Sequence, residues 1–345
     1  MIRFECDYTE GCIPEILEAI ARENHTQLKG YSEDTISERV KQQIRTLCGK
    51  EDAAVHFLVG GTQTNTTVIS SVLRPHQGVL SVDAGHIACH ETGAIEATGH
   101  KVIALPSANG RLTAEQIDSY CAAHYADGSF EHIVQPGMVY ISHPAENGSL
   151  YSLKELEAIR KACDKWKLPL FMDGARLGYG LGSPATDVTL QDIARLTDVF
   201  YIGGTKVGAL FGEAVVITNP ALQKDFRYLI KRHGGMLAKG WLLAIQFEEL
   251  LKDDRYFKLG KKAVEQALRI KEAFEKKGCD FFMESYTNQQ FPILTDAQLQ
   301  VFDGEFTYTV WAPMDDGRKA VRFATSWATT DDQLQKLLEK ISKAL

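Results

Sequence analysis

The sequence lacks the features of several large protein classes. No apolar run approaches the roughly 18 residues that span a membrane, and the first residues, MIRFECDYTEG, lack the basic and then apolar layout of a signal peptide. The net charge is a modest -7, and basic clusters such as 161–167 are interrupted by acidic and apolar residues. We therefore expect a cytoplasmic protein that has neither a nucleic acid nor a membrane as its partner.

The cysteine and glycine patterns exclude further classes. Seven cysteines form an odd set without a CxxC pair, so neither a disulfide framework nor a zinc cage is expected. No GxGxxG segment opens a helix, which argues against a nicotinamide-dependent dehydrogenase. What is present is an ordinary globular composition, with 44% apolar and 24% charged residues.

The length of 345 residues exceeds the usual size of a single hydrophobic core, which favours a large domain with a smaller companion and a cleft between them. Apolar residues at helical spacing over 12–24 and 34–48 predict an N-terminal arm with helices, residues 1–48. We expect a large domain over 49–250 and a small α+β domain over 251–345.

Strands alternate with helices in the predicted large domain, which is typical of an α/β fold with a mostly parallel sheet. The clearest crossover is the helix at 152–166, whose apolar residues recur every three or four positions. A helical stretch at 238–277, short strands and a terminal helix at 331–344 follow in the small domain. The seven strands predicted for the large sheet are 53–60, 78–83, 100–105, 137–142, 168–173, 198–203 and 213–218.

Residues that directly follow these strands are the first candidates for a site, because open parallel sheets bind ligands beyond the carboxyl ends of their strands. Gly60 and Gly61 follow the first strand and open a helix, where free backbone N–H groups and the helix dipole would favour a phosphate. A helix N-cap without a ligand explains these two glycines about as well.

Asp173 and Lys206 each follow an apolar strand. An aspartate there can pair with a protonated pyridine nitrogen, although an Asp-Gly turn is the alternative. Lys206 follows a Gly-Gly-Thr turn, a setting that suits a Schiff-base lysine or a lysine that binds phosphate or carboxylate. Their separation of 33 positions leaves room for a loop, a helix and one strand, so the two side chains are expected on nearby strand ends.

The combination of motifs resembles the threonine aldolase and β-eliminating lyase group of fold-type-I pyridoxal phosphate enzymes, along most of the chain. The motifs that carry the resemblance are Tyr31 with its acidic neighbours, Gly61-Thr62-Gln63-Thr64-Asn65, Ala84-Gly85-His86 with Glu91, Glu146-Asn147-Gly148, Asp173-Gly174-Ala175-Arg176, Thr205-Lys206 and Val321-Arg322.

The resemblance implies a role for each of these residues. Lys206 would carry pyridoxal 5'-phosphate, His86 would stack on its pyridine ring, and Arg176 and Arg322 would hold the substrate carboxylate in their planar forks. The expected cofactor contacts are Gly61, Thr62, Gln63, His86, Asp173, Arg176 and Lys206. The expected substrate contacts are Cys6, Tyr31, Arg176 and Arg322. The expected catalytic residues are Lys206, His86, His90 and Glu146.

The chain departs from the family pattern near the expected β-hydroxyl group of the substrate. Cys6 stands where better-known members have a serine, and Glu146 stands where they have a second active-site histidine, with His143 three residues earlier. His86 and His90 are four residues apart, as in a helical metal pair, but ring stacking by His86 needs no metal, so no metal site is expected.

The resemblance predicts a low-specificity L-threonine aldolase type of lyase, which cleaves a β-hydroxy-α-amino acid to glycine and an aldehyde. A β-eliminating lyase is the first alternative, and an aminotransferase, which shares the lysine and the aspartate, is the second. A non-catalytic binding domain has no need for Asp173, Arg176 and Lys206 together. The family further implies a homodimer or homotetramer with shared active sites, which the predicted N-terminal arm fits.

Overall fold

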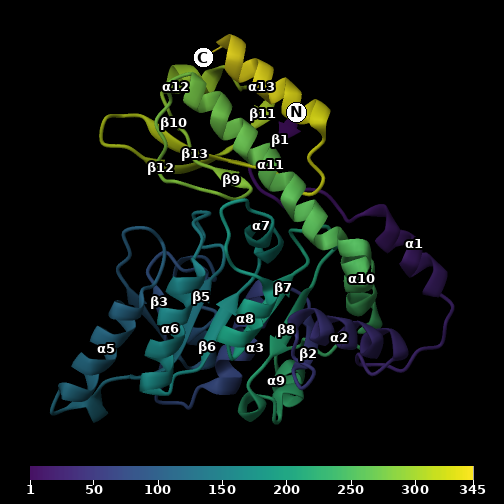
Figure 1. Ribbon diagram of the computed structural model, residues 1–345, viewed down its shortest axis with the longest axis vertical. Coiled ribbons are helices and arrows are strands. Elements are labelled where there is room, and N and C mark those ends of the chain that lie inside the picture. The colour runs from purple at the N-terminus through teal and green to yellow at the C-terminus, as the bar shows by residue number, and fades with distance from the viewer. Residues whose placement is uncertain (345) are drawn as a thin grey trace.

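The computed structural model describes residues 1–344, which form a large and a small layered region joined by a long helix (Figure 1). The large region is built on a seven-stranded sheet. In spatial order its strands are β2 (Ala54–Leu58), β8 (Glu213–Ile217), β7 (Val199–Gly203), β6 (Leu170–Asp173), β5 (Gln135–Ser142), β3 (Gln77–Val82) and β4 (Lys101–Leu105).

All seven predicted strands occur, and the predicted α/β fold is confirmed. Strands β4, β3, β5, β6 and β7 are parallel to one another, whereas β8 runs antiparallel to both β7 and β2. The reversal follows from the sequence: only nine residues separate β7 from β8, too few for a crossover to a parallel strand. As a result, β2 points the same way as the parallel strands.

Helices cover both faces of this sheet. One face packs against α2 (Thr35–Cys48), α5 (Ala114–Ala126), α6 (Leu153–Trp166), α8 (Leu190–Leu196) and α10 (Trp241–Leu251). The other packs against α3 (Gly61–Val72), α4 (His86–Cys89) and α9 (Phe226–Arg232). The strands alternate between these two cores: Ile141 and Met172 face the first, and Tyr140 and Phe171 face the second.

Local signals fix several helix ends. Ser152 and Glu155 form a capping box at the start of α6, and the Asp34 side chain accepts a hydrogen bond from the Ser37 N–H at the start of α2. The remaining helices of the large region are α1 (Pro14–Glu23) and α7 (Leu177–Leu181). Short 3-10 turns lie at Glu96–Thr98, Phe130–His132, Pro220–Leu222 and Lys252–Asp254.

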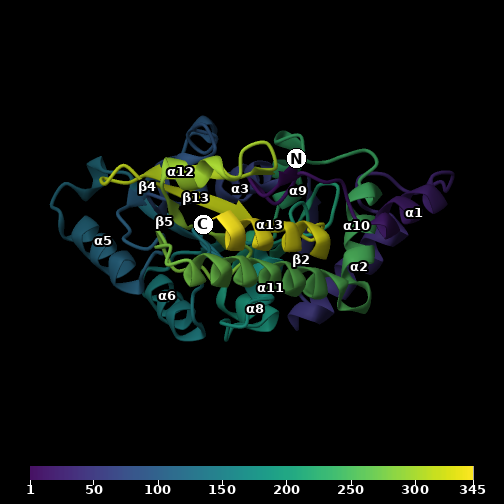
Figure 2. The same cartoon turned by 90° about the horizontal axis from the view of Figure 1, so that it is seen from above.

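The small region is an antiparallel sheet covered by helices. Figure 2 shows α11 (Arg255–Lys276) and α13 (Asp331–Ala344) side by side over it. Its other elements are β9 (Gln289–Gln290), β10 (Ile293–Leu294), α12 (Asp296–Gln300), β11 (Phe306–Thr307), β12 (Thr309–Pro313) and β13 (Lys319–Ala324). Their apolar side chains form a separate core around Phe302 and Phe323.

Two details of the small region differ from the sequence prediction. The expected helical stretch at 238–277 is two helices, because Asp253 and Asp254 adopt left-handed backbone conformations between α10 and α11. The N-terminal residues also contribute a strand, β1 (Ile2–Arg3), which pairs in parallel with β11. The chain therefore starts in the small region and crosses to the large one over residues 4–13. Among residues 1–344, no helix is long and apolar enough to cross a membrane.

Candidate active site

A cavity of about 760 Å³ lies beyond the carboxyl ends of β2, β3, β5, β6 and β7 and reaches the small region. The residues that line it from the sheet side include Gly60, Gly61, Thr62, His86, His90, Glu146, Asp173, Arg176, Tyr201, Thr205, Lys206 and Glu213. Thr309, Val310, Trp311 and Arg322 line it from the small region. The sheet thus brings together the strand ends that the sequence had singled out.

Asp173 is the last residue of β6, and its carboxylate is buried at the base of the cavity. One oxygen accepts a hydrogen bond from the Tyr140 hydroxyl at 2.6 Å and another from Asn65 at 3.2 Å, and the second oxygen accepts from the Ala175 N–H at 3.0 Å. Burial alone would raise the pKa of Asp173, but the hydroxyl groups of Tyr140 and Tyr201 and the Ala175 N–H lower it. The carboxylate therefore stays negative and fixed in orientation.

His86 is held by a buried carboxylate. Its Nδ1 lies 2.8 Å from Glu91 Oε1, which also accepts a hydrogen bond from Asn65 at 2.7 Å. Asn65 thus connects the His86–Glu91 pair with Asp173. Burial would lower the pKa of His86, but the hydrogen bond with Glu91 and the nearby negative charges raise it. The ring is oriented by its Nδ1 contact, and His90 lies beside it at a ring-centroid distance of 5.8 Å.

Lys206 lies three residues beyond the end of β7. Its Nζ makes no hydrogen bond or ion pair with any of residues 1–344, and its carbonyl accepts a hydrogen bond from the Tyr179 hydroxyl. Burial and the positive charge of Arg176 lower the pKa of the Lys206 amine. An amine that loses its proton more easily is a better nucleophile toward an aldehyde.

The glycine turn after β2 forms one end of the cavity. Gly60 precedes α3, and a Cβ atom built on it would meet no heavy atom within 4 Å, so the space next to the helix N-terminus is open. A Cβ atom on Gly61 would lie 3.3 Å from the Tyr201 hydroxyl, which is also close enough to Asp173 to lower the pKa of that carboxyl group. The free backbone N–H groups at this end of α3 suit an anionic group such as a phosphate.

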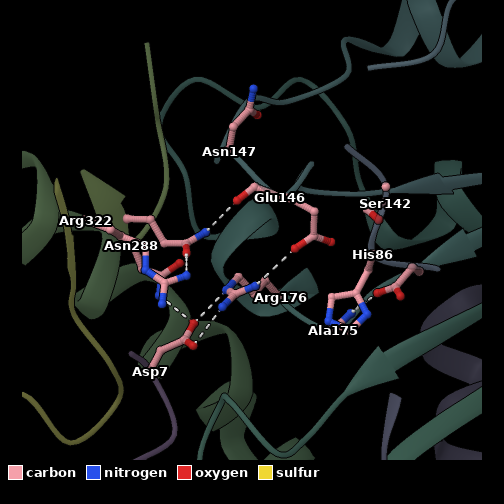
Figure 3. A network of polar contacts seen from close by, with 12 residues as sticks. Asp7, His86, Ser142, Glu146, Asn147, Ala175, Arg176, Asn288 and Arg322 are labelled. Atoms are coloured by element: carbon pink, nitrogen blue, oxygen red, sulfur yellow. Dashed lines mark hydrogen bonds and ion pairs between the residues drawn. The ribbon is translucent and has the colours of Figure 1, made fainter. Parts of the chain in front are cut away.

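Arg176 and Asp7 form a buried ion pair that sequence reasoning did not predict. Arg176 Nε lies 2.8 Å from one Asp7 oxygen and its Nη2 lies 3.0 Å from the other, and Asn288 donates to the same carboxylate at 3.0 Å. Figure 3 shows Asp7 and Glu146 on opposite sides of the guanidinium, with Glu146 at 3.8 Å. Burial would raise the pKa of Asp7, but Arg176 and Lys206 lower it to about 2.

Arg322 reaches the cavity from β13. It donates to the Glu5 carbonyl at 2.7 Å and to Gln289 at 3.1 Å, and its guanidinium lies 5.5 Å from the centre of the Trp311 ring. Its Nε is buried without a partner among residues 1–344, and no carboxylate of those residues lies within 4 Å of it. Arg322 is therefore a cation whose charge is open to an anionic ligand.

Three of the predicted site residues, and also His143, lie away from the cavity lining. Gln63 accepts a hydrogen bond from the Val59 N–H and donates to the His233 carbonyl, which ties α3 to a loop. Cys6 precedes Asp7 but is not among the lining residues. Tyr31 lies 45% exposed at a separate surface hollow, and the side chain of His143 is fully buried.

Several residues of the site went unrecognised in the sequence. Asn65 and Glu91 occur in the family motifs, but nothing in their spacing shows that one joins His86 to Asp173. The lining residues Glu213 and Trp311 lie within strands β8 and β12, and the ion-pair partner Asp7 lies in the segment after β1. A rule that inspects acidic residues at both ends of predicted strands would have found Glu213, the first residue of the predicted strand 213–218.

The residues fit pyridoxal phosphate. A buried carboxylate that is kept negative, an unpaired lysine and an open helix N-terminus all face one cavity. Asp173 would pair with the ring nitrogen, the α3 N-terminus would meet the phosphate, and Lys206 would bond the aldehyde carbon.

Comparison with known proteins identifies the family. A family model described as beta-eliminating lyase matches residues 6–297. A solved structure of Leishmania major threonine aldolase is 44% identical, with a TM-score of 0.96 and coverage of 99% of both chains. The low specificity L-threonine aldolase of a Pseudomonas strain is 28% identical over 98% of this chain and 96% of its own.

A more distant structure shares the fold. Cystalysin from Treponema denticola, whose structure contains pyridoxal 5'-phosphate, has a TM-score of 0.73 at 16% identity, covering 100% of this chain and 91% of its own. These matches confirm the family and the fold predicted from the sequence. They also confirm the prediction that the protein is a pyridoxal-phosphate-dependent lyase. The chain belongs to the beta-eliminating lyase family.

Proposed function

We propose that the protein is an aldolase of the threonine aldolase type, which cleaves a β-hydroxy-α-amino acid to glycine and an aldehyde. The observation that carries the proposal is the common cavity of Lys206, Asp173 and Arg322 in a chain that resembles the Leishmania major threonine aldolase over its full length. An unpaired lysine, a fixed carboxylate and an open guanidinium are what a lyase of small amino acids requires.

The substrate carboxylate would bind Arg322, whose fork is incompletely used by the protein. Arg176 would contribute its charge, since Asp7 already occupies its Nε and Nη2 and Glu146 lies 3.8 Å from its Nη1. Holding the carboxylate at one place would orient the bonds of the substrate Cα relative to a bound cofactor. Arg322 would therefore help to select the bond that breaks as well as the substrate.

A base must then remove the proton of the β-hydroxyl group. Glu146, His86 and His90 line the cavity and are the candidates. His86 is oriented by Glu91 through Nδ1, which leaves Nε2 for a partner in the cavity. Pyridoxal phosphate, when bound, supplies the electron sink for the pair left by the broken Cα–Cβ bond. Return of a proton to Cα gives glycine, and the other fragment leaves as an aldehyde.

The test is aldehyde release by the purified protein with pyridoxal phosphate. We expect acetaldehyde and glycine in equal amounts from L-threonine or L-allo-threonine, and the ratio of the two rates gives the preference at Cβ. Pyruvate and ammonia from L-serine, without aldehyde from either threonine, would instead identify a β-eliminating lyase. Accumulation of pyridoxamine phosphate would identify an aminotransferase.

We propose further that the protein is a homodimer or homotetramer with shared active sites. Tyr31, an expected substrate contact, lies at a surface hollow of about 560 Å³ with Arg227, Tyr228 and Lys231, away from the cavity of its own chain. Tyr228 is 76% exposed there. Mixing inactive Tyr31→Ala and Lys206→Ala proteins should restore activity if Tyr31 serves a second copy, and light scattering should give the mass of the assembly.

We also propose that the protein is located in the cytoplasm. All seven cysteines are free thiols in the structure, as is usual in reducing compartments. Fractionation of the native cells, followed by immunodetection of the protein, is the direct measurement. Recovery in the membrane or secreted fraction would contradict the proposal.

A further inference from the structure

Glu213 is a buried acid in the cavity that the proposed mechanism does not use. It is the first residue of β8, pairs in register with Gly203 at the end of β7, and is 3% exposed. It lines the same cavity as Lys206. Burial of a carboxyl group costs free energy unless hydrogen bonds or opposite charges compensate for the lost water. The contacts of Glu213 therefore show what the group does in the cavity.

The contacts of Glu213 converge on the turn that carries Lys206. Its Oε1 accepts a hydrogen bond from the Thr205 hydroxyl at 2.9 Å, and its Oε2 accepts one from the Gly204 N–H at 3.2 Å. The Thr205 hydroxyl in turn accepts from the Gly212 N–H at 3.0 Å. The Glu213 carboxyl group therefore binds both residues that directly precede Lys206.

Neither Glu213 nor Lys206 has a close partner of opposite charge. Within residues 1–344, no nitrogen of Lys, Arg or His lies within 4 Å of the Glu213 carboxyl, and no carboxylate oxygen lies within 4 Å of Lys206 Nζ. Asp7, whose negative charge also acts on Lys206, is already paired with Arg176. Burial raises the pKa of Glu213, while burial and Arg176 lower the pKa of Lys206.

We propose that Glu213 is a positioning residue, which fixes the Thr205–Lys206 turn and sets the proton occupancy of the Lys206 nitrogen. An ionised Glu213 favours a protonated nitrogen by Coulomb attraction between two buried groups, and a neutral Glu213 releases that proton. The other titratable groups that face the pair are Asp7, Tyr8, Glu146, Asp173, Arg176, Tyr201 and Tyr256. The inference rests on the cofactor of the family and is independent of the substrate.

The test is a pH titration of the visible absorption band of the holoenzyme, because that band reports the proton on the Lys206 nitrogen. Glu213→Gln keeps the size of the side chain and an acceptor oxygen but carries no charge. We expect its midpoint to fall by about one pH unit. Glu213→Asp, which keeps the charge, should recover most of that shift. Glu272→Gln, an exposed acid on α11, should titrate like the wild type.

An unchanged midpoint in a folded Glu213→Gln protein would overturn the inference and leave Glu213 a purely structural residue. If this variant does not fold, Thr205→Val tests the same link, since it removes the donor to Oε1 and so disfavours the ionised carboxyl group. Its midpoint should also fall, whereas Thr205→Ser keeps the hydroxyl and the midpoint. A Thr205→Val midpoint equal to that of the wild type would equally overturn the inference.

This result can be separated from a failure of the proposed function. The band titrates whether or not aldehyde is produced from threonine. A shifted midpoint together with no aldehyde release would support the role of Glu213 and refute the aldolase activity. An unshifted midpoint together with aldehyde release would support the aldolase activity and refute the role of Glu213.

Discussion

The two walls of the cavity are built in different ways. On the sheet side, Asp173 and the Glu91–His86 pair are buried and held by hydrogen bonds that Asn65 joins into one network. On the side of the small region, Val310 is 54% exposed and Arg322 keeps an unpartnered Nε. The first wall is fixed before any ligand arrives, as cofactor chemistry requires, whereas the second leaves interactions for a substrate.

The largest effect is expected on the sheet side, at Lys206. Lys206→Ala removes the amine that would bond the cofactor aldehyde, so the visible band should vanish and kcat/KM for aldehyde release should fall at least about a thousandfold. Absorption spectra before and after dialysis against pyridoxal phosphate measure the first effect. A variant that retains the visible band would show that another residue carries the cofactor.

Asp173 should come next. Asp173→Asn keeps the shape of the side chain but removes the charge that would pair with the ring nitrogen, and we expect kcat to fall about a hundredfold with the protein still folded. Tyr140→Phe removes one donor to Asp173 and serves as the graded comparison, with a loss of about tenfold. Equal rates for Asp173→Asn and the wild type would contradict the assigned role.

A smaller effect, on substrate binding, is expected on the opposite wall. Arg322→Lys keeps a positive charge but loses the planar fork, so KM should rise about tenfold while kcat and the visible band change little. The matched change on the sheet side, Arg176→Lys, disturbs the bidentate contact with buried Asp7 and should lower the unfolding temperature as well. If both variants raise KM and leave the unfolding temperature unchanged, Arg176 is not more tightly built into the fold than Arg322.

The sheet side was also the more predictable wall. Asp173 and Lys206 stand at the ends of apolar strands, and parallel strands deliver their carboxyl ends to one edge, so strand patterns alone bring these residues together. The reversed direction of β8 could have been derived from its short connection to β7. Such strands can be recognised in the sequence because each one buries its own apolar side chains in the folded sheet.

The pairing of Asp7 with Arg176 could not be predicted in this way. The two residues are 169 positions apart, and Asp7 reaches Arg176 only because β1 pairs with β11 and anchors the N-terminal segment in the small region. Residues 2 and 3 show no strand pattern that would reveal this pairing. The position of Arg322 depends on the same segment, since the Glu5 carbonyl accepts its hydrogen bond. Contacts between such distant segments depend on tertiary structure that no single stretch encodes.

The smallest predicted effect concerns the ion pair that joins the two walls. The pKa of Asp7 is lowered to about 2 from an ordinary value of 3.8, so its ionised form stabilises the folded state at all pH values well above 4. This contribution, about 2 kcal/mol, is lost as the pH falls from about 4 through 2, because the folded protein must then bury a protonated Asp7 beside Arg176. Asp7→Asn lacks the titrating group. Urea unfolding at pH 7 and at pH 3 should therefore show a free-energy gap between wild type and Asp7→Asn that narrows at the lower pH, and a gap that stays constant would mean that Asp7 holds Arg176 by shape rather than by charge.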